Sequence, residues 1–261
     1  MITSAKNIRI KAFCELREKS RERRKQGLFV VEGYREITLA IEAGYRLTAL
    51  YFCAEMPAAA AFAEGIGKAA PVQAVSRDVF EKMACREHSD GLLAVSAARN
   101  TTFDELQLSH NPFIIVVEAV EKPGNLGAIL RTADAAKVDA VVVCDPLTDI
   151  YNPNVIRSSL GCLFTQQTVV AGAAETAAWL HEQRITSYAA ELNATQWYHE
   201  TDFTRPCAIV LGTEAGGLSS YWLQHAGARI KIPMRGRVDS LNVSVSTAIL
   251  AFEAMRQRGF R

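Results

Sequence analysis

The sequence predicts an α/β protein with two domains, the second of which is built on a mostly parallel β-sheet. Short apolar runs alternate with amphipathic segments along the chain of 261 residues, and this alternation is typical of sheets covered by helices. The polar stretch ARNTTFDELQLSHNP interrupts the alternation and ends in a proline, which indicates a domain boundary. We therefore expect a three-layer α/β/α domain over residues 1–98, a linker over 99–111 and a second α/β domain over 112–261.

The first of these domains begins with the most basic segment of the chain, KNIRIKAFCELREKSRERRKQG. Apolar residues at helical spacing predict a single amphipathic helix there. Arg21, Arg23 and Arg24 are candidates for contacts with phosphate groups, although a bare charge run is more typical of a solvated helix face. Beyond this segment, the patterns predict strands over 28–33, 47–52, 71–76 and 91–98, and helices over 34–44, 57–66 and 77–84.

The second domain shows the same alternation with longer apolar runs. Because these runs are apolar at nearly every position, they predict strands buried on both faces, as in a parallel sheet. The predicted strands cover 113–119, 140–144, 166–170, 185–191, 207–212 and 228–233. The predicted helices lie near 125–137, 153–160, 173–183, 218–225 and 241–258.

Composition narrows the classes of function. Lys and Arg number 29 against 28 Asp and Glu, so any binding of nucleic acid must rest on local charge rather than on net charge. The six cysteines form no C-x-x-C pair, which indicates reduced thiols in a cytosolic protein. The five histidines lack metal-ligand spacing, and no segment is typical of a signal peptide or membrane span. We therefore expect a cytoplasmic protein that uses neither a metal nor a membrane.

The stretch EKPGNLGAILRTADAA, residues 121–136, follows a predicted buried strand and continues as a helix. A strand, a glycine-rich turn and a helix often place an anion at the helix N-terminus. Gly124 and Gly127 alone do not form the dinucleotide fingerprint, and no Lys-Ser/Thr pair follows them as in a P-loop. Taken alone, the turn could simply cap a helix.

Two further stretches strengthen the case for a binding site. AIVLGTEAGGLSSYWL, residues 208–223, joins a buried strand to a helix through a glycine-rich turn. RIKIPMRGRVDSLNVSVSTAILAFEAMRQR, residues 229–258, joins a strand to a long helix through a polar loop. Open α/β sheets bind ligands at the carboxyl ends of their strands, where all three stretches place polar groups. Together they predict a ligand site.

The three stretches together resemble the SpoU (TrmH) family of RNA 2′-O-ribose methyltransferases, within the SPOUT superfamily. The residues that carry the resemblance are NLG at 125–127 with Arg131, LG at 211–212 with Glu214 and GGL at 216–218, and IPM at 232–234 with Gly236 and SLNVSV at 240–245. The first domain is similar, over about 26–98, to the ribosomal-protein-L30-like RNA-binding module found upstream of many SpoU domains, through FVVEGYREITLAIEAG and GLLAV.

The resemblance implies a fold and a cofactor. It implies a C-terminal SPOUT domain whose chain forms a trefoil knot, and a homodimer joined through the last helix. The apolar residues of that helix could equally serve the protein's own core; they are Val243, Ala248, Ile249, Phe252 and Met255. The implied cofactor is S-adenosylmethionine, with S-adenosylhomocysteine as product. The residues expected to bind it are Gly212, Thr213, Ile232, Met234 and Leu241.

The resemblance also assigns the catalytic role to Arg131. A ribose hydroxyl is a poor nucleophile until its proton is removed or its developing charge is stabilised. Because a guanidinium is ordinarily protonated, Arg131 is either a base in a strongly perturbing site, a stabiliser of the alkoxide, or a bidentate holder of a phosphate that takes the proton. Asn125 and Glu214 are expected to orient the arginine and the loops.

Three more residues are expected to take part. Ser240 and Asn242 are expected to shape the ribose pocket, although either could be only the N-cap of the last helix. Arg157, in RSSLGCLF, is expected to contact RNA together with Arg21, Arg23 and Arg24.

The L30-like module favours ribosomal RNA of the 23S type as the substrate of this predicted methyltransferase. Three alternatives remain open from the sequence: a transfer-RNA 2′-O-methyltransferase, a non-catalytic RNA-binding or ribosome-assembly factor on the same scaffold, and a nucleotide-dependent oxidoreductase. Retention of Arg131, Asn125, Glu214 and Asn242 argues against the second alternative, and the incomplete glycine pattern at 124–127 argues against the third.

Overall fold

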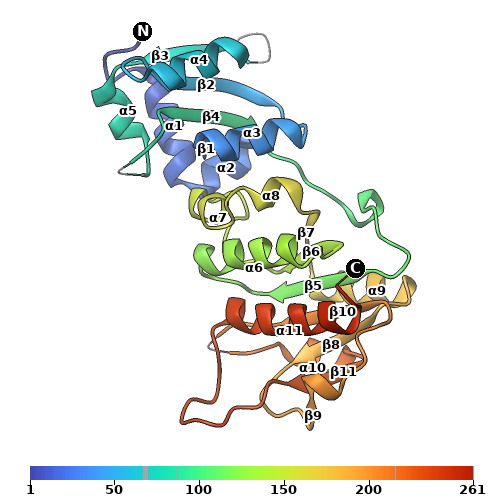
Figure 1. Cartoon of the computed structure of the whole chain (residues 1–261). Coiled ribbons are helices and arrows are strands. Elements are labelled where there is room, and N and C mark those ends of the chain that lie inside the picture. Colours follow the sequence, from blue (N-terminus) through green and yellow to red (C-terminus); the bar gives the residue numbers. More distant parts are fainter. Residues whose placement is uncertain (67–69, 87, 215, 261) are drawn as a thin grey trace. The chain divides into compact units, whose positions relative to one another are not determined.

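The computed structural model describes residues 1–66, 70–86, 88–214 and 216–260 (Figure 1). The chain forms two compact units. The first unit comprises Met1–Arg99 and Asp149–Thr165, and the second comprises Asn100–Thr148 and Gln166–Arg261. Residues 149–165, which the alternation of strands and helices assigns to the second domain, therefore group with the first.

The first unit contains a mixed four-stranded sheet. Its strands are β1 (Leu28–Glu32), β2 (Leu47–Cys53), β3 (Val72–Val75) and β4 (Leu92–Ala97), in the order β1-β4-β2-β3. β4 is antiparallel to both of its neighbours, whereas β2 and β3 are parallel. All four strands lie where the apolar runs predict them.

Helices surround this sheet, and the basic N-terminal segment differs from the prediction. The helices are α1 (Ile8–Glu18), α2 (Ser20–Gln26), α3 (Tyr34–Glu42), α4 (Pro57–Ile66), α5 (Arg77–Met83), α7 (Pro153–Ser158) and α8 (Cys162–Thr165). The single predicted N-terminal helix is two helices, because Lys19 is extended with φ −110° and ψ 110°. Arg23 donates to the carbonyls of Leu16 and Arg17, at 2.8 and 3.1 Å, and so satisfies acceptors at the end of α1.

Arg23 also holds residues 149–165 in the first unit. Its Nε donates to Asp149 Oδ2 at 2.5 Å, and both side chains are buried. On the same segment, Tyr151 stacks on Phe29 with ring centroids 4.3 Å apart, and Phe164 stacks on Phe29 at 6.0 Å. Breaking a buried ion pair of this kind leaves an uncompensated charge, so the pair helps to fix where this segment docks.

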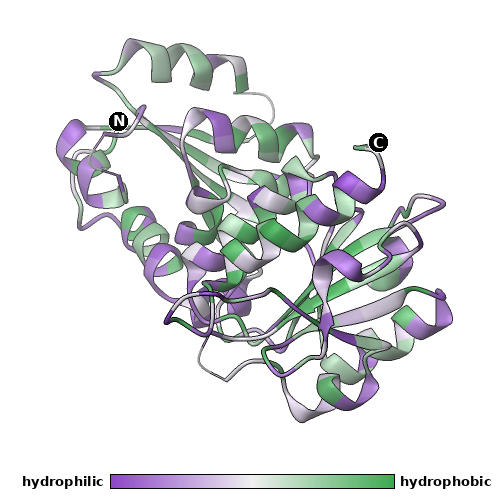
Figure 2. Ribbon diagram, turned by 60° about the horizontal axis from the view of Figure 1, so that its bottom comes forward, coloured by the Kyte–Doolittle hydropathy of each residue, from purple (hydrophilic) through white to green (hydrophobic). Residues whose placement is uncertain are grey.

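The second unit contains a seven-stranded sheet in which every paired strand is parallel to its neighbour. The strands are β5 (Phe113–Glu118), β6 (Ala140–Cys144), β7 (Thr168–Ala171), β8 (Thr186–Ala190), β9 (Gln196–Trp197), β10 (Cys207–Leu211) and β11 (Ala228–Lys231), in the order β7-β6-β5-β10-β8-β11-β9. The pairings confirm the predicted mostly parallel sheet. β5, β6 and β10 are buried at every position. Several strands are green in Figure 2, where green marks hydrophobic residues.

The helices of the second unit are α6 (Pro123–Ala135), α9 (Ala173–Glu182), α10 (Ser220–His225) and α11 (Val243–Gln257), with short 3₁₀ turns η1 (Phe103–Glu105) and η2 (Tyr198–Glu200). α6 and α11 lie side by side (Figure 1). The predicted linker is not free of structure, because Phe103 stacks on Trp179 at 4.5 Å. None of the described helices is both long and apolar enough to cross a membrane.

Arg258, at the end of α11, ties the C-terminal helix to the edge of the parallel sheet. Its guanidinium donates to backbone carbonyls of Phe203, Asn111 and Arg205 at 2.8, 2.7 and 2.6 Å. It also lies over the ring of Phe113, 5.3 Å from the centroid. One partly buried cation therefore satisfies acceptors from two separate connections.

Arg258→Ala should destabilise the protein by about 2–4 kcal/mol, because several charge-assisted hydrogen bonds are lost and the carbonyls lose their partner. Urea denaturation checks this value. Arg256→Ala is the matched control, since that side chain is 62% exposed and pairs with Glu253 three residues away. Equal midpoints for the two variants would contradict the anchoring role of Arg258.

Candidate active site

The three glycine-rich or polar loops all leave the carboxyl ends of strands in the second unit. β5 and β10 are neighbouring parallel strands, so the loops that follow them start next to each other. β11 lies beyond β8 in the same sheet and also runs parallel to its neighbours. This arrangement brings side chains from distant parts of the sequence to one edge of the sheet, as expected for a ligand site.

The loop after β10 is closed by its own backbone. Thr213 and Gly217 exchange two backbone hydrogen bonds of 3.0 Å, and Gly216 N donates to Thr213 Oγ1 at 2.9 Å. Gly217 has φ +65°, a conformation that favours glycine. Gly212 faces the backbone of Gly217 and Leu218 so closely that a Cβ at position 212 would collide with it. Ala215 lies outside the described residues.

A cavity of about 430 Å³ lies against this loop and the loop after β11. Its volume falls within the range of small-molecule and cofactor sites. The cavity wall includes all five residues predicted to bind the cofactor, namely Gly212, Thr213, Ile232, Met234 and Leu241. Ser240, predicted for the ribose pocket, also lines it.

The cavity has walls that the motif analysis did not include. Leu223 adds apolar surface beside the motif residues Leu211 and Leu218, and Glu191 and Asn193 add polar groups from the loop after β8. The sequence could have suggested Glu191 as a site residue, because it is the last residue of the strand predicted over 185–191, and strand ends of this kind bind ligands. Apolar side chains around strand-end backbone groups suit a flat, hydrogen-bonding ring such as adenine, so the residues present fit S-adenosylmethionine.

A second, smaller cavity adjoins the first. It is lined by Val120, Glu121, Lys122, Asn125, Gly212, Thr213, Glu214 and Val243. Gly212, Thr213, Glu214 and Val243 belong to both cavities. A ligand in the larger cavity and a group entering the smaller one would therefore share a wall.

Glu214 joins the three loops by hydrogen bonds. Its carboxylate accepts from Asn125 Nδ2 at 3.1 Å, from Asn242 Nδ2, and from Lys122 Nζ at 2.8 Å. Asn242 Nδ2 also donates to Asn125 Oδ1 at 3.2 Å. The hydrogen bond from Lys122 is the largest of the causes that lower the pKa of Glu214, so the carboxylate stays ionised at neutral pH.

Asn242 combines the two roles that the sequence left open. Its Oδ1 accepts from Ser244 N at 2.9 Å and so caps α11 at its N-terminus. Its Nδ2 faces Glu214 and Asn125. Because the cap fixes the side chain, the amide nitrogen is held in the network rather than left to solvent.

Arg131 lies on α6 with an exposed side chain. It lines neither of the two cavities described above. The structure thus brings Asn125, Glu214 and Asn242 into contact but leaves Arg131 outside that network. Its catalytic role stays a prediction.

The four arginines predicted to contact RNA differ in exposure. Arg21 and Arg24 are exposed on α2. Arg23 is 4% exposed, because its guanidinium is occupied by Asp149 and by the carbonyls at the end of α1, so the expectation of an exposed Arg23 needs correction. Arg157 is exposed on α7, within the first unit.

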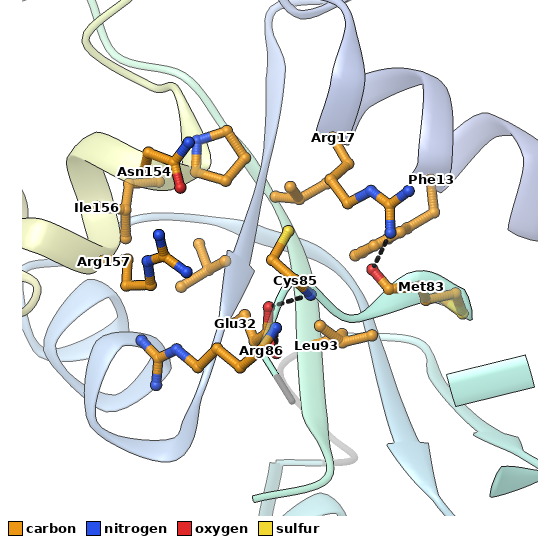
Figure 3. A pocket seen from close by; sticks show the side chains of 13 residues that line it. Phe13, Arg17, Glu32, Met83, Cys85, Arg86, Leu93, Asn154, Ile156 and Arg157 are labelled. Carbon is orange, nitrogen blue, oxygen red and sulfur yellow. Dashed lines mark hydrogen bonds between the residues drawn. The ribbon is translucent and has the colours of Figure 1, made fainter. Parts of the chain in front are cut away.

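Arg157 lines a pocket of the first unit, shown in Figure 3. Arg17 and Arg157 lie on opposite sides of Cys85, and the backbone N–H of Cys85 donates to Glu32 at 2.7 Å. Arg17 is already occupied, since it donates to the carbonyls of Lys82 and Met83. Arg17 also pairs with Glu18, and Arg86, which lines the same pocket, pairs with Glu36. Arg157 is therefore the candidate for a phosphate contact in this pocket.

Comparisons with known proteins show which proteins this chain resembles. The model of the "SpoU rRNA Methylase family" matches residues 112–252, and the "MRM3-like substrate binding domain" matches residues 7–94. A solved RNA 2′-O ribose methyltransferase is 38% identical, with a TM-score of 0.83 and 98% of each chain covered. AviRb of Streptomyces viridochromogenes, solved in complex with AdoMet, is 26% identical, with a TM-score of 0.89 over 97% of this chain and 98% of that one.

A curated relative supports the same assignment. The 23S rRNA (guanosine-2′-O-)-methyltransferase RlmB of Pectobacterium atrosepticum is 34% identical over 197 residues, which cover 72% of this chain and 80% of the relative. The parallel sheet and the strand-end cavities therefore define a SPOUT-type methyltransferase with an appended substrate-binding domain. The chain belongs to the SpoU rRNA methylase family.

Proposed function

We propose that the protein is an S-adenosylmethionine-dependent RNA methyltransferase that methylates a ribose 2′-OH, in ribosomal RNA of the 23S type. The observation that carries the proposal is the pair of adjoining cavities, one lined by the predicted cofactor residues and the other by Lys122, Asn125 and Glu214 among others. Membership of the family, and the names of the relatives that cover this chain, support the same reaction and substrate.

In this proposal the larger cavity binds the cofactor. The backbone at Gly212, Ile232 and Leu241 would hold it, with Thr213 and Met234 alongside. When bound, the cofactor supplies an electrophilic methyl group on a sulfonium. The close approach of Gly212 to the Gly217 backbone keeps the loop narrow enough to form that wall.

The smaller cavity would receive the target ribose. Ionised Glu214 holds the amides of Asn125 and Asn242, and Ser240 lines the adjoining cofactor cavity. Arg131 stabilises the developing alkoxide or holds the neighbouring phosphate in a bidentate contact. The ribose oxygen would bond to the methyl carbon as the bond between that carbon and the sulfonium sulfur breaks, which would release S-adenosylhomocysteine. The hydroxyl proton would pass to the neighbouring phosphate.

The first unit would bind the RNA. Its residues 7–94 match a substrate-binding domain, and Arg21, Arg24 and Arg157 are exposed on it. These features favour ribosomal RNA over transfer RNA, because the predicted L30-like module is usual in ribosomal enzymes of the family. We place the protein in the cytoplasm, in keeping with its six free cysteines.

We also propose a homodimer joined through α11, and the trefoil knot that the family resemblance implies. Val245 and Phe252 on α11 are 47% and 45% exposed, which is unusual for large apolar side chains on one helix. Val243, in contrast, is buried within the chain. In this proposal one side of α11 packs into the core of the second unit, and the exposed apolar side chains face a second copy of the chain.

Transfer of labelled methyl groups tests the proposed reaction. Purified enzyme is incubated with methyl-labelled S-adenosylmethionine and unmodified ribosomal RNA or, separately, transfer RNA, and the product is tested for alkali-resistant ribose methylation. Label in ribosomal RNA is the expected result. Label in transfer RNA alone would keep the reaction but assign transfer RNA as the substrate. If the protein binds the cofactor but labels neither RNA nor ribosomal particles, the non-catalytic alternative is favoured.

Removing the charge of Arg21 and Arg24 together should weaken RNA binding and reduce its salt dependence. The slope of log K against log salt concentration is negative, and each lost phosphate contact should make it less steep by somewhat less than about one. Filter binding at several salt concentrations measures the slope. A double variant with Lys82→Ala and Arg184→Ala, which removes exposed charges from other elements, is the control. Equal slopes for both double variants would contradict an RNA contact by Arg21 and Arg24 and would favour a solvated face of α2.

A further inference from the structure

Lys122 donates a hydrogen bond to Glu214 and lies in the stretch 121–136, but it is not among the residues that carry the family resemblance. It stands at the N-cap position of α6, and its carbonyl accepts from Asn125 N at 3.0 Å. Its side chain is 69% exposed, yet its Nζ lies 2.8 Å from Glu214 Oε2. The residue thus connects the start of α6 to the loop after β10.

The two oxygens of Glu214 have separate partners. Oε2 accepts from Lys122, whereas Oε1 accepts from both Asn125 and Asn242. The terminal torsion of a glutamate is broad and has no strong preference of its own. A cation on one oxygen therefore fixes the orientation of the carboxylate plane, and a rotation away from that orientation would disturb both hydrogen bonds to the amides.

The consequences reach two helices. Asn125 lies in the first turn of α6, and Asn242 caps α11 through Ser244 N. Asn125 and Asn242 also contact each other at 3.2 Å. Both asparagines and Lys122 thus depend on one carboxylate, and Lys122, Asn125 and Glu214 all line the smaller cavity.

We propose that Lys122 is a positioning residue, which orients Glu214 so that Asn125 keeps its place at the smaller cavity and Asn242 keeps its place at the N-terminus of α11. The inference rests on the proposed function of that cavity. An exposed ion pair contributes little to folding stability. Loss of Lys122 should therefore appear in turnover, while the unfolding midpoint and the binding of substrates stay nearly constant.

Three variants test the proposal in the full-length protein. Lys122→Met keeps the aliphatic length without the charge, and Lys122→Arg keeps the charge. Lys137→Met is the matched control, because Lys137 is exposed just beyond the other end of α6. We expect Lys122→Met to lower kcat about tenfold, as small displacements of positioned groups do. KM for RNA, cofactor Kd and Tm should change less than about twofold.

The conservative variant separates positioning from other roles. Lys122→Arg should recover most of kcat, because a guanidinium can also donate to Glu214 Oε2. An unchanged kcat in Lys122→Met would overturn the proposal. A raised KM for RNA with normal kcat would also overturn it, since Lys122 would then be a direct phosphate contact.

A second measurement is independent of methyl transfer. The side-chain amide resonances of Asn125 and Asn242 can be followed by ¹⁵N NMR in wild type and in both Lys122 variants. We expect Lys122→Met to shift or broaden both resonances and Lys122→Arg to restore them. Unchanged resonances would refute the positioning role even if the wild type transferred no methyl group, so the two failures are distinguishable.

Discussion

Gly212→Ala should reduce the affinity for S-adenosylmethionine by more than about 100-fold, equivalent to roughly 3 kcal/mol. A methyl group at this position would collide with the backbone of Gly217 and Leu218 rather than with a flexible side chain. The loop after β10 would have to move, and it forms a wall of the larger cavity. Isothermal titration calorimetry measures the affinity, with circular dichroism to confirm the fold.

Gly124→Ala is the matched control for this substitution. Gly124 lies in the first glycine-rich turn, and a Cβ there would meet nothing within 4 Å. The cofactor affinity of this variant should stay near that of wild type. Wild-type affinity in Gly212→Ala would contradict the proposed cavity.

A gentler change tests the same loop should Gly212→Ala fail to fold. Thr213→Val removes the Oγ1 that accepts from Gly216 N, without adding bulk. Because one turn-closing hydrogen bond is worth about 1 kcal/mol, the affinity should fall about fivefold.

Arg131→Ala should lower kcat for RNA methylation by about 100-fold or more while cofactor affinity changes only a few-fold. Removing one preorganised donor to a developing anion costs about this much in other enzymes. Cofactor affinity should persist because Arg131 lines neither cavity. Single-turnover methyl transfer measures the first quantity and calorimetry the second.

Two companions sharpen the interpretation of the arginine variant. Arg131→Lys keeps the charge but loses the planar, bidentate geometry, so it should recover only part of the rate. Arg184→Ala, which removes an exposed arginine elsewhere in the second unit, should leave the rate unchanged. A large loss of cofactor affinity in Arg131→Ala would instead assign Arg131 to the cofactor site.

The predicted site residues came together to different degrees. The five cofactor candidates share one cavity, and Asn125, Glu214 and Asn242 share hydrogen bonds. These residues follow strand ends, and neighbouring parallel strands end at one edge of a sheet. Lys122 was missed, because nothing in its local pattern reveals a partner 92 residues away.

The sequence by itself determined the α/β class, the positions of nearly all the strands, and the family. The strand observed at Phe113–Glu118 coincides with the run predicted at 113–119, because period and apolarity are local properties. The resemblance to the family rested on three motifs, whose order and spacing are properties of the sequence and need no tertiary structure.

Only the tertiary structure decided the placement of residues 149–165 and of Arg23. The pattern RERRK predicts an exposed basic face. In the structure, however, the guanidinium of Arg23 pairs with Asp149, 126 residues further along, and is buried. Whether an arginine meets water or a buried carboxylate depends on contacts between distant segments. Periodicity carries no information about such contacts, so the fold alone could separate Arg23 from its exposed neighbours Arg21 and Arg24.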